Sequence, residues 1–148
     1  MREIGLSTEL EAPAGAVWRM LQRSESLRFV AAPVLRIEDD LPRYWGDSGG
    51  SVTLENMRLF GWLPLWTHEI RLVSLNEERW EILTEERGGP VRLWRHRIRL
   101  HPLSENRCQY TDRVELEAGV LTPGVWLFAR LFYGHRQRRW RQLARLLD

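Results

Sequence analysis

The chain has 148 residues, of which 43% are hydrophobic and 28% are charged, a balance typical of a globular rather than a disordered protein. This length predicts a single domain over residues 1–148. The formal net charge of +2 is too small to indicate DNA binding. Apolar runs are too short to cross a bilayer and the N-terminus lacks the apolar core of a signal peptide, so we expect a cytoplasmic protein.

The chain begins with a predicted strand and two short helices. Residues 3–11 alternate between apolar and polar side chains, which is typical of a strand. Pro13 suits the start of a helix, and the apolar spacing after it is helical. Ser24 is the expected cap of a second helix, which runs through Ala31 and ends before Pro33.

From Pro33 onward the apolar period changes to two, which predicts a series of short strands. Clusters of Gly, Pro, Ser and Asn separate them as turns, and strands this close in sequence pair antiparallel. In residues 51–59 apolar side chains occur at both parities, so the inward face and the presence of a bulge stay open. The predicted strands are 34–39, 41–45, 51–59, 66–72, 80–86, 91–100 and 108–116, with turns at 46–50, 61–64 and 88–90 and a hairpin loop at 101–106.

A long helix closes the chain. Pro123 suits its first turn, and an apolar stripe follows to the end over roughly 24 residues, or about 36 Å. Gly134 lies inside it at a cost of about 1 kcal/mol against Ala, which predicts a weak spot or a bend. The order β-α-α-β(about 6)-α predicts an α+β fold, in which a curved antiparallel sheet surrounds the C-terminal helix. Such a sheet leaves a space beside the helix that an apolar small molecule can fill.

One pair of polar residues is suited to chemistry beside that space. A hairpin that turns near Glu105 places His96 opposite Val114 and diagonal to Asp112. A His–Asp pair next to an apolar cavity can act as a general acid and base, so His96 and Asp112 are the candidate catalytic residues. The alternative is that both are structural, bound to arginines of the last helix or to the backbone.

The candidate ligand-binding residues occupy the inward faces of the strands and the apolar stripe of the helix. Among them, His68 shares a face with two apolar residues and is the candidate polar anchor, the alternative being an ordinary core or surface histidine. The set is Trp66, His68, Ile70, Trp94, Ile98, Tyr110, Val114, Phe128 and Phe132.

The last helix combines an apolar first half with a basic second half. This pattern is typical of an interfacial helix, and it predicts contact with an anionic membrane surface or an acidic partner. The alternative is a buried apolar stripe with a solvated arginine face, and the sequence leaves open a monomer or a dimer. The arginines concerned are Arg136, Arg138, Arg139 and Arg141.

Several other kinds of site are not predicted. Four dispersed His and the single Cys108 have no metal-ligand spacing, and no phosphate-binding loop, dinucleotide motif or nucleophile elbow occurs, so we expect neither a metal nor a cofactor. Glu85 and Glu86 are neighbours on a strand and point to opposite faces, so they are interpreted as a solvated strand end.

Four segments give the chain a family resemblance. They are "APAGAVWRML" after the first strand, "GGPVRLWRHRIRL" with a Gly-Pro-x-x-x-Trp-x-His pattern, "CQYTDRVELEAG" and the Arg-rich end "GVLTPGVWLFARLFYGHRQRRWRQLARLL". In this order they resemble the START/Bet v 1-like (SRPBCC) helix-grip superfamily, in particular the bacterial polyketide cyclase/dehydrase-like ligand-binding proteins.

The resemblance implies a cavity for a lipid, a quinone or a polyketide-like compound. Our first expectation is therefore a carrier or sensor of a hydrophobic or aromatic molecule. One alternative is a cyclase/dehydratase that uses His96 and Asp112, and another is a partner-binding module that acts through the Arg-rich helix. Because a fold does not fix an activity, a choice among these three hypotheses requires the geometry of the site.

Overall fold

The computed structural model describes residues 1–47 and 49–147. Along these residues a strand and two helices are followed by eight further strands and one long helix. Ser48, within the predicted turn at 46–50, lies outside the described residues. The elements are β1 (Arg2–Leu10), α1 (Ala14–Leu21), α2 (Ser24–Ala31), β2 (Leu35–Ile37), β3 (Ser51–Leu54), β4 (Met57–Leu59), β5 (Leu63–Pro64), β6 (His68–Asn76), β7 (Glu81–Gly88), β8 (Val91–Ser104), β9 (Arg107–Glu117) and α3 (Thr122–Ala144), with 3-10 turns at Trp45–Asp47 and Gly119–Leu121.

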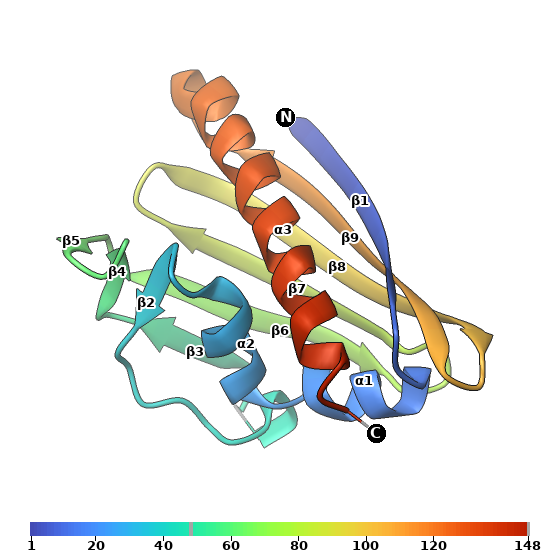
Figure 1. Ribbon diagram of the computed structural model, residues 1–148. Coiled ribbons are helices and arrows are strands. Elements are labelled where there is room, and N and C mark those ends of the chain that lie inside the picture. The colour runs from blue at the N-terminus through green and yellow to red at the C-terminus, as the bar shows by residue number, and fades with distance from the viewer. Residues whose placement is uncertain (48, 148) are drawn as a thin grey trace.

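The main sheet is antiparallel, and its strand order is β1-β9-β8-β7-β6-β3. It curves around α3, which lies across its concave side and packs against β1, β9 and α2 (Figure 1). This arrangement confirms the predicted helix-grip fold. The helix extends over 23 residues, close to the predicted length, and continues through Gly134 without interruption.

The predicted strand at 51–59 is wrong as a single element. It divides into β3, which joins the main sheet, and β4, which pairs with β2 and β5 in a small second sheet. The turn between them is held by Asp39, whose carboxylate oxygens accept hydrogen bonds from the backbone N–H groups of Glu55 (2.7 Å) and Asn56 (2.9 Å). The change of sheet explains why apolar residues occur at both parities, and with β5 it raises the number of strands above about six.

Two further local predictions are wrong. Residues 41–45 form no strand beyond an isolated bridge between Arg23 and Tyr44, because Pro42 has no N–H to donate to a strand partner. Ser24 is the first residue of α2 rather than its cap, a position that Arg23 occupies without a side-chain hydrogen bond.

The hairpin loop predicted at 101–106 is shorter than expected. Pairing between β8 and β9 continues through a register shift after Pro102 and ends with Ser104 opposite Arg107. The turn therefore contains only Glu105 and Asn106, and a long, strongly paired hairpin forms the middle of the sheet.

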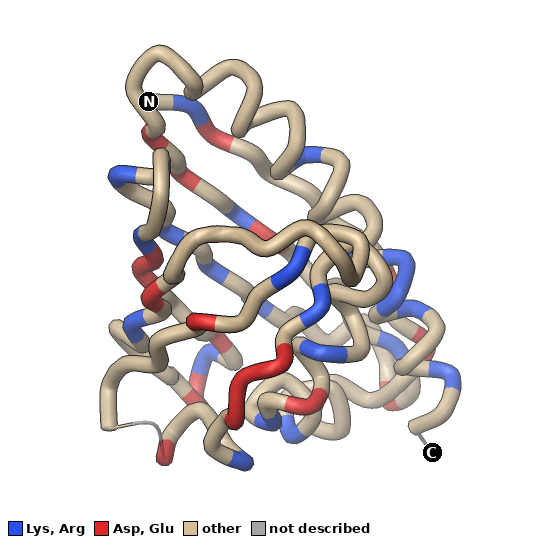
Figure 2. Tube along the Cα trace, turned by 90° about the vertical axis from the view of Figure 1, so that its left-hand side faces the viewer, with Lys and Arg blue, Asp and Glu red and all other residues tan. Residues whose placement is uncertain are grey.

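The outer face of the sheet is charged, and the inner face is largely apolar. Figure 2 shows acidic and basic positions side by side along the strands, where Glu85 accepts hydrogen bonds from Arg71 (3.1 Å) and Arg95 (2.9 Å). On the inner side, buried apolar residues form separate clusters around Trp140, around Tyr133 and around Leu54. The candidate site lies where these clusters meet.

Candidate functional site

Two adjoining cavities lie between the concave side of the sheet, α2 and α3. The outer cavity has a volume of about 310 Å³, and the inner one has a volume of about 90 Å³. Ligand pockets begin at roughly 300 Å³, so only the outer cavity reaches the size of a binding site for a small molecule. Both cavities are lined by Leu27, Ile70, Glu86 and Arg136, which therefore form the border between them.

The outer cavity is lined mostly by apolar side chains from the small sheet, the ends of β6 to β8 and the first half of α3. Six of the nine predicted ligand-binding residues lie here, and Trp66 and Phe128, each 37% exposed, mark a side on which it reaches solvent. These six are Trp66, His68, Ile70, Trp94, Phe128 and Phe132.

The prediction placed Trp66 on one face of a strand, but in the structure Trp66 does not lie on a strand. It precedes β6 and packs over the turn between β7 and β8, where a Cβ on Gly89 would lie 2.4 Å from the Trp66 ring. Gly89 has a φ of +53°, so both the backbone and the close approach of the ring favour glycine here. The turn at Gly89 therefore fixes the position of Trp66, which forms one wall of the outer cavity.

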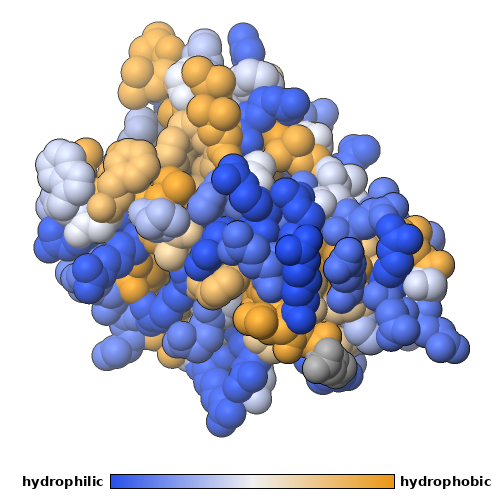
Figure 3. All heavy atoms as spheres, viewed as in Figure 1, coloured by the Kyte–Doolittle hydropathy of each residue, from blue (hydrophilic) through white to orange (hydrophobic). Residues whose placement is uncertain are grey.

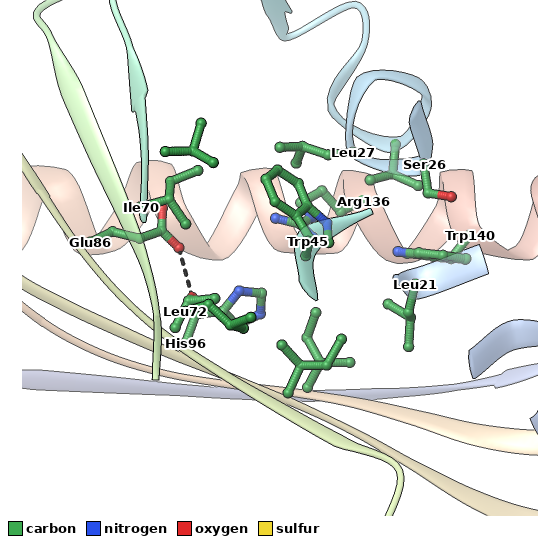
Figure 4. Close-up of a pocket in the computed structure, with 15 residues that line it drawn as sticks. Leu21, Ser26, Leu27, Trp45, Ile70, Leu72, Glu86, His96, Arg136 and Trp140 are labelled. Atoms are coloured by element: carbon green, nitrogen blue, oxygen red, sulfur yellow. Dashed lines mark hydrogen bonds between the residues drawn. The ribbon is translucent and has the colours of Figure 1, made fainter. Parts of the chain in front are cut away.

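The inner cavity contains Ile98 and His96, and it extends toward α1 and the second half of α3. Figure 4 shows Glu86 and His96 at one end of it, and Leu21 and Trp140 at the other. Tyr110 and Val114, which complete the predicted ligand-binding set, are packed in the clusters around Trp140 and Tyr133 instead.

His96 and Asp112 form the centre of a buried hydrogen-bond network. His96 lies opposite Val114 as the hairpin predicts, and its Nε2 is 2.6 Å from Oδ1 of Asp112. The Asp112 carboxylate also accepts hydrogen bonds from the hydroxyl of Tyr110 (3.3 Å) and from Nε2 of Gln137 on α3 (3.0 Å). Burial and the Asp112 carboxylate raise the pKa of Tyr110 well above its ordinary value, so its hydroxyl stays a donor.

Glu86 faces inward, so its interpretation as part of a solvated strand end is wrong. Its carboxylate lies 2.9 Å from Nε2 of His68 and accepts a hydrogen bond from the Thr84 hydroxyl (3.1 Å). Burial by itself raises the pKa of Glu86, but the hydrogen bond with His68 and the nearby positive charges outweigh it, so the pKa lies below 4.5. Glu85 points outward, as the strand period requires.

Arg136 is also on the inside, which corrects its place in the predicted basic surface. It is 9% exposed and projects from the buried face of α3, one turn after Phe132 and one turn before Trp140. Of the other arginines in that cluster, Arg138 is exposed, whereas Arg139 and Arg141 are bonded to the protein body. These bonds join Arg139 Nε to the carbonyl of Phe29 (3.0 Å) and Arg141 to the hydroxyl of Thr8 (2.9 Å).

Besides the hydrogen bond from Gln137 to Asp112, a second hydrogen bond joins α3 to the sheet, beside the outer cavity. The indole N–H of Trp94 donates to the Tyr133 hydroxyl at 2.9 Å, and the Tyr133 ring lies 4.7 Å from the His96 ring. Burial and the nearby Glu86 raise the pKa of Tyr133. These contacts fix the position of α3 above both cavities.

Sequence reasoning missed Glu86, Arg136 and Tyr133. The signals were present, because Glu86 shares strand parity with the buried Ile82, and Arg136 lies four residues after Phe132 on the apolar stripe. The charge of Glu86 and Arg136 indicated solvent-exposed positions, since charged residues are seldom fully buried. In the part of the chain that the structure describes, no group of three His, Cys, Asp or Glu could hold a metal ion.

Apolar side chains also gather on the molecular surface over the first turns of α3 (Figure 3). Val120 is 96% exposed and Leu131 is 68% exposed. Within residues 1–47 and 49–147, no helix is long and apolar enough to cross a membrane.

Solved structures with the same architecture come from bacteria and plants. A START superfamily protein from Mycobacterium smegmatis is 14% identical, covers 99% of each chain and has a TM-score of 0.71. Norcoclaurine synthase from Thalictrum flavum, in complex with dopamine and hydroxybenzaldehyde, is 13% identical over 99% of this chain and 88% of that one, with a TM-score of 0.73. The Zhui aromatase/cyclase from a Streptomyces species is 14% identical over 97% and 93%, with a TM-score of 0.70.

At these identities the likeness shows the fold alone, which is the helix-grip fold of the START/Bet v 1-like proteins that the sequence motifs resemble. No curated protein sequence matches the chain. One family model matches residues 8–144, which is most of the chain. The chain therefore belongs to the family described as Domain of unknown function (DUF8410).

Proposed function

We propose that the protein binds a hydrophobic or aromatic small molecule in the outer cavity, as a carrier or sensor. The observation that carries this proposal is the cavity itself, about 310 Å³ in volume and lined mostly by apolar side chains beneath α3. Enclosing apolar surface in such a space releases about 25 cal/mol per Å². The norcoclaurine synthase complex with two aromatic compounds supports the idea that this fold can accommodate such molecules.

Native mass spectrometry of the purified protein tests this proposal. We expect a co-purified apolar adduct that is lost from a variant whose outer cavity is filled. Ile70→Trp is suitable, because Ile70 lines both cavities from β6, and Val73→Trp on the same strand is the control because Val73 is 42% exposed. The proposal fails if the adduct is absent, or if the two variants retain it equally.

A second candidate function is proton transfer to or from the bound molecule. The specific observation in its favour is the 2.6 Å contact between His96 and Asp112, with His96 at the wall of the inner cavity. Because a carboxylate only accepts, Nε2 of a neutral His96 carries the proton and Nδ1 is left as the basic nitrogen. Asp112 therefore positions His96, and His96 is the candidate acid and base.

Isotope exchange distinguishes an enzyme from a carrier. The adduct is returned to the protein in D₂O, and its mass is followed with time. A general base would introduce deuterium at an acidic carbon with the wild-type protein and not with His96→Gln, while both bind the adduct. Equal exchange in the two proteins, or none in either, rejects the enzymatic hypothesis and leaves binding as the function.

A further inference from the structure

Unlike His68, His96 and Asp112, the buried Arg136 has no hydrogen-bond or ion-pair partner among the described residues. His68 is bonded to Glu86, and His96 to Asp112, at 2.9 and 2.6 Å. Within the described ranges, by contrast, no hydrogen bond or ion pair is made by the guanidinium of Arg136. Its Nε–H is sealed from solvent and unsatisfied. Buried charges are normally paired, so this group needs an explanation.

The surrounding protein neutralises the guanidinium only in part. The rings of Phe132 and Tyr133 lie 5.8 and 5.1 Å from it, which is favourable for a cation but satisfies none of its five N–H donors. Burial lowers the pKa of Arg136, but the surrounding tyrosines and the carboxylates of Asp112 and Glu86 outweigh this, so the pKa is raised and the group stays charged.

The position of Arg136 makes its free donors available to a ligand. The residue lines both cavities, and Figure 4 shows it extending from α3 into the space between the helix and the sheet. A molecule whose apolar body fills the outer cavity would place its inner end at this border. The guanidinium is thus located where a polar head group of that molecule would lie.

Resting on the proposed function, we propose that Arg136 anchors the carboxylate of an otherwise apolar ligand. A carboxylate matches the planar fork of a guanidinium and accepts two parallel hydrogen bonds from it. It also supplies one negative charge, the amount that a single unpaired arginine requires. A phosphate monoester would bring up to two negative charges beside Glu86, which disfavours that head group.

Matched acid and alcohol probes test the assignment. Decanoate and decanol form a linear pair, and naphthoate and naphthylmethanol form an aromatic pair. Each is titrated into the full-length protein by calorimetry, with tryptophan fluorescence as a second signal because Trp66 and Trp94 line the outer cavity. Charge-assisted hydrogen bonds predict that the acid of at least one pair binds about 10- to 100-fold more tightly than its alcohol.

Variants of two arginines on α3 show which residue causes the preference for the acid over the alcohol. Arg136→Met and Arg136→Gln are expected to abolish the preference for the acid, so that each variant binds the acid and the alcohol of a pair with equal affinity. Arg138→Met, which removes an exposed arginine on the same helix, is expected to keep the preference. We expect the melting temperature of Arg136→Met to equal or exceed that of the wild type, because the unpaired buried charge is gone. A loss of folding in both Arg136 variants would indicate a structural arginine and overturn the assignment.

The remaining outcomes separate this inference from the proposed function. Equal affinity for acid and alcohol in the wild type, or a preference that survives in both Arg136 variants, overturns the carboxylate anchor and leaves an apolar binding protein. If the wild type binds no member of either pair, the proposed function fails and the anchor fails with it.

Discussion

Nε2 of His96 on β8 lies 2.6 Å from Oδ1 of Asp112 on β9, and the Asp112 side chain is completely buried. Tyr110 from the same strand and Gln137 from α3 direct further donors at the same carboxylate. The pair therefore joins two strands and the helix, and it holds the His96 ring at the wall of the inner cavity. Stability and site geometry depend on the same contact.

Asp112→Ala is expected to destabilise the protein by about 3–5 kcal/mol, because it leaves three buried donors without their acceptor. The free energy of unfolding from urea titration measures the change. Arg113→Gln, at the exposed neighbouring position, is the control and is expected to change it by no more than about 0.5 kcal/mol. A loss below about 1 kcal/mol for Asp112→Ala would contradict a structural role for this carboxylate.

Glu86 is expected to contribute to unfolding at acid pH. Its pKa is lowered in the folded protein, so its stabilising contribution is present above the ordinary value of 4.5 and is lost as pH falls through the folded pKa. Urea titrations between neutral pH and pH values below 4.5 should therefore show a shallower loss of stability for Glu86→Gln than for the wild type. Glu69→Gln, which removes an exposed carboxylate from β6, should retain the wild-type slope, and identical slopes in all three proteins would refute the prediction.

The turn beneath Trp66 is expected to tolerate no side chain at Gly89. A Cβ there would lie 2.4 Å from the Trp66 ring, and its φ of +53° costs an L-residue roughly 1–2 kcal/mol even without that clash. Gly89→Ala should lower the melting temperature and change the tryptophan fluorescence, because the Trp66 ring must move away from the added methyl group. Gly5→Ala on β1 has open space around its Cβ and is the matched control. Equal melting temperatures would show that the turn is not constrained in this way.

Cys108 is expected to be chemically inert in the folded protein. It is completely buried in the cluster around Trp140, and burial raises the pKa of its thiol to about 11. Because the thiolate is the reactive form, Ellman's reagent at pH 8 should react only when the protein unfolds. Addition of urea should restore one equivalent of reactive thiol. Rapid reaction of the native protein would contradict this burial.

Local patterns in the sequence determined most of the architecture. The period of two in residues 91–100 and 108–116, with a short turn between them, placed His96 opposite Val114. The apolar stripe after Pro123 predicted the long closing helix, since periodicity follows directly from which side chains face a core. The strand division at Glu55 was not predicted, because it depends on the distant carboxylate of Asp39.

Only the tertiary structure decided which charged residues lie inside. Glu86 and Arg136 occupy inward positions by their periodicity, but charge alone argues for solvent, and the two are 50 residues apart in the sequence. The curvature of the sheet brings their elements together at the border of two cavities. A cavity arises from the way whole elements pack against one another, so no local pattern of residues encodes its volume or its polar lining.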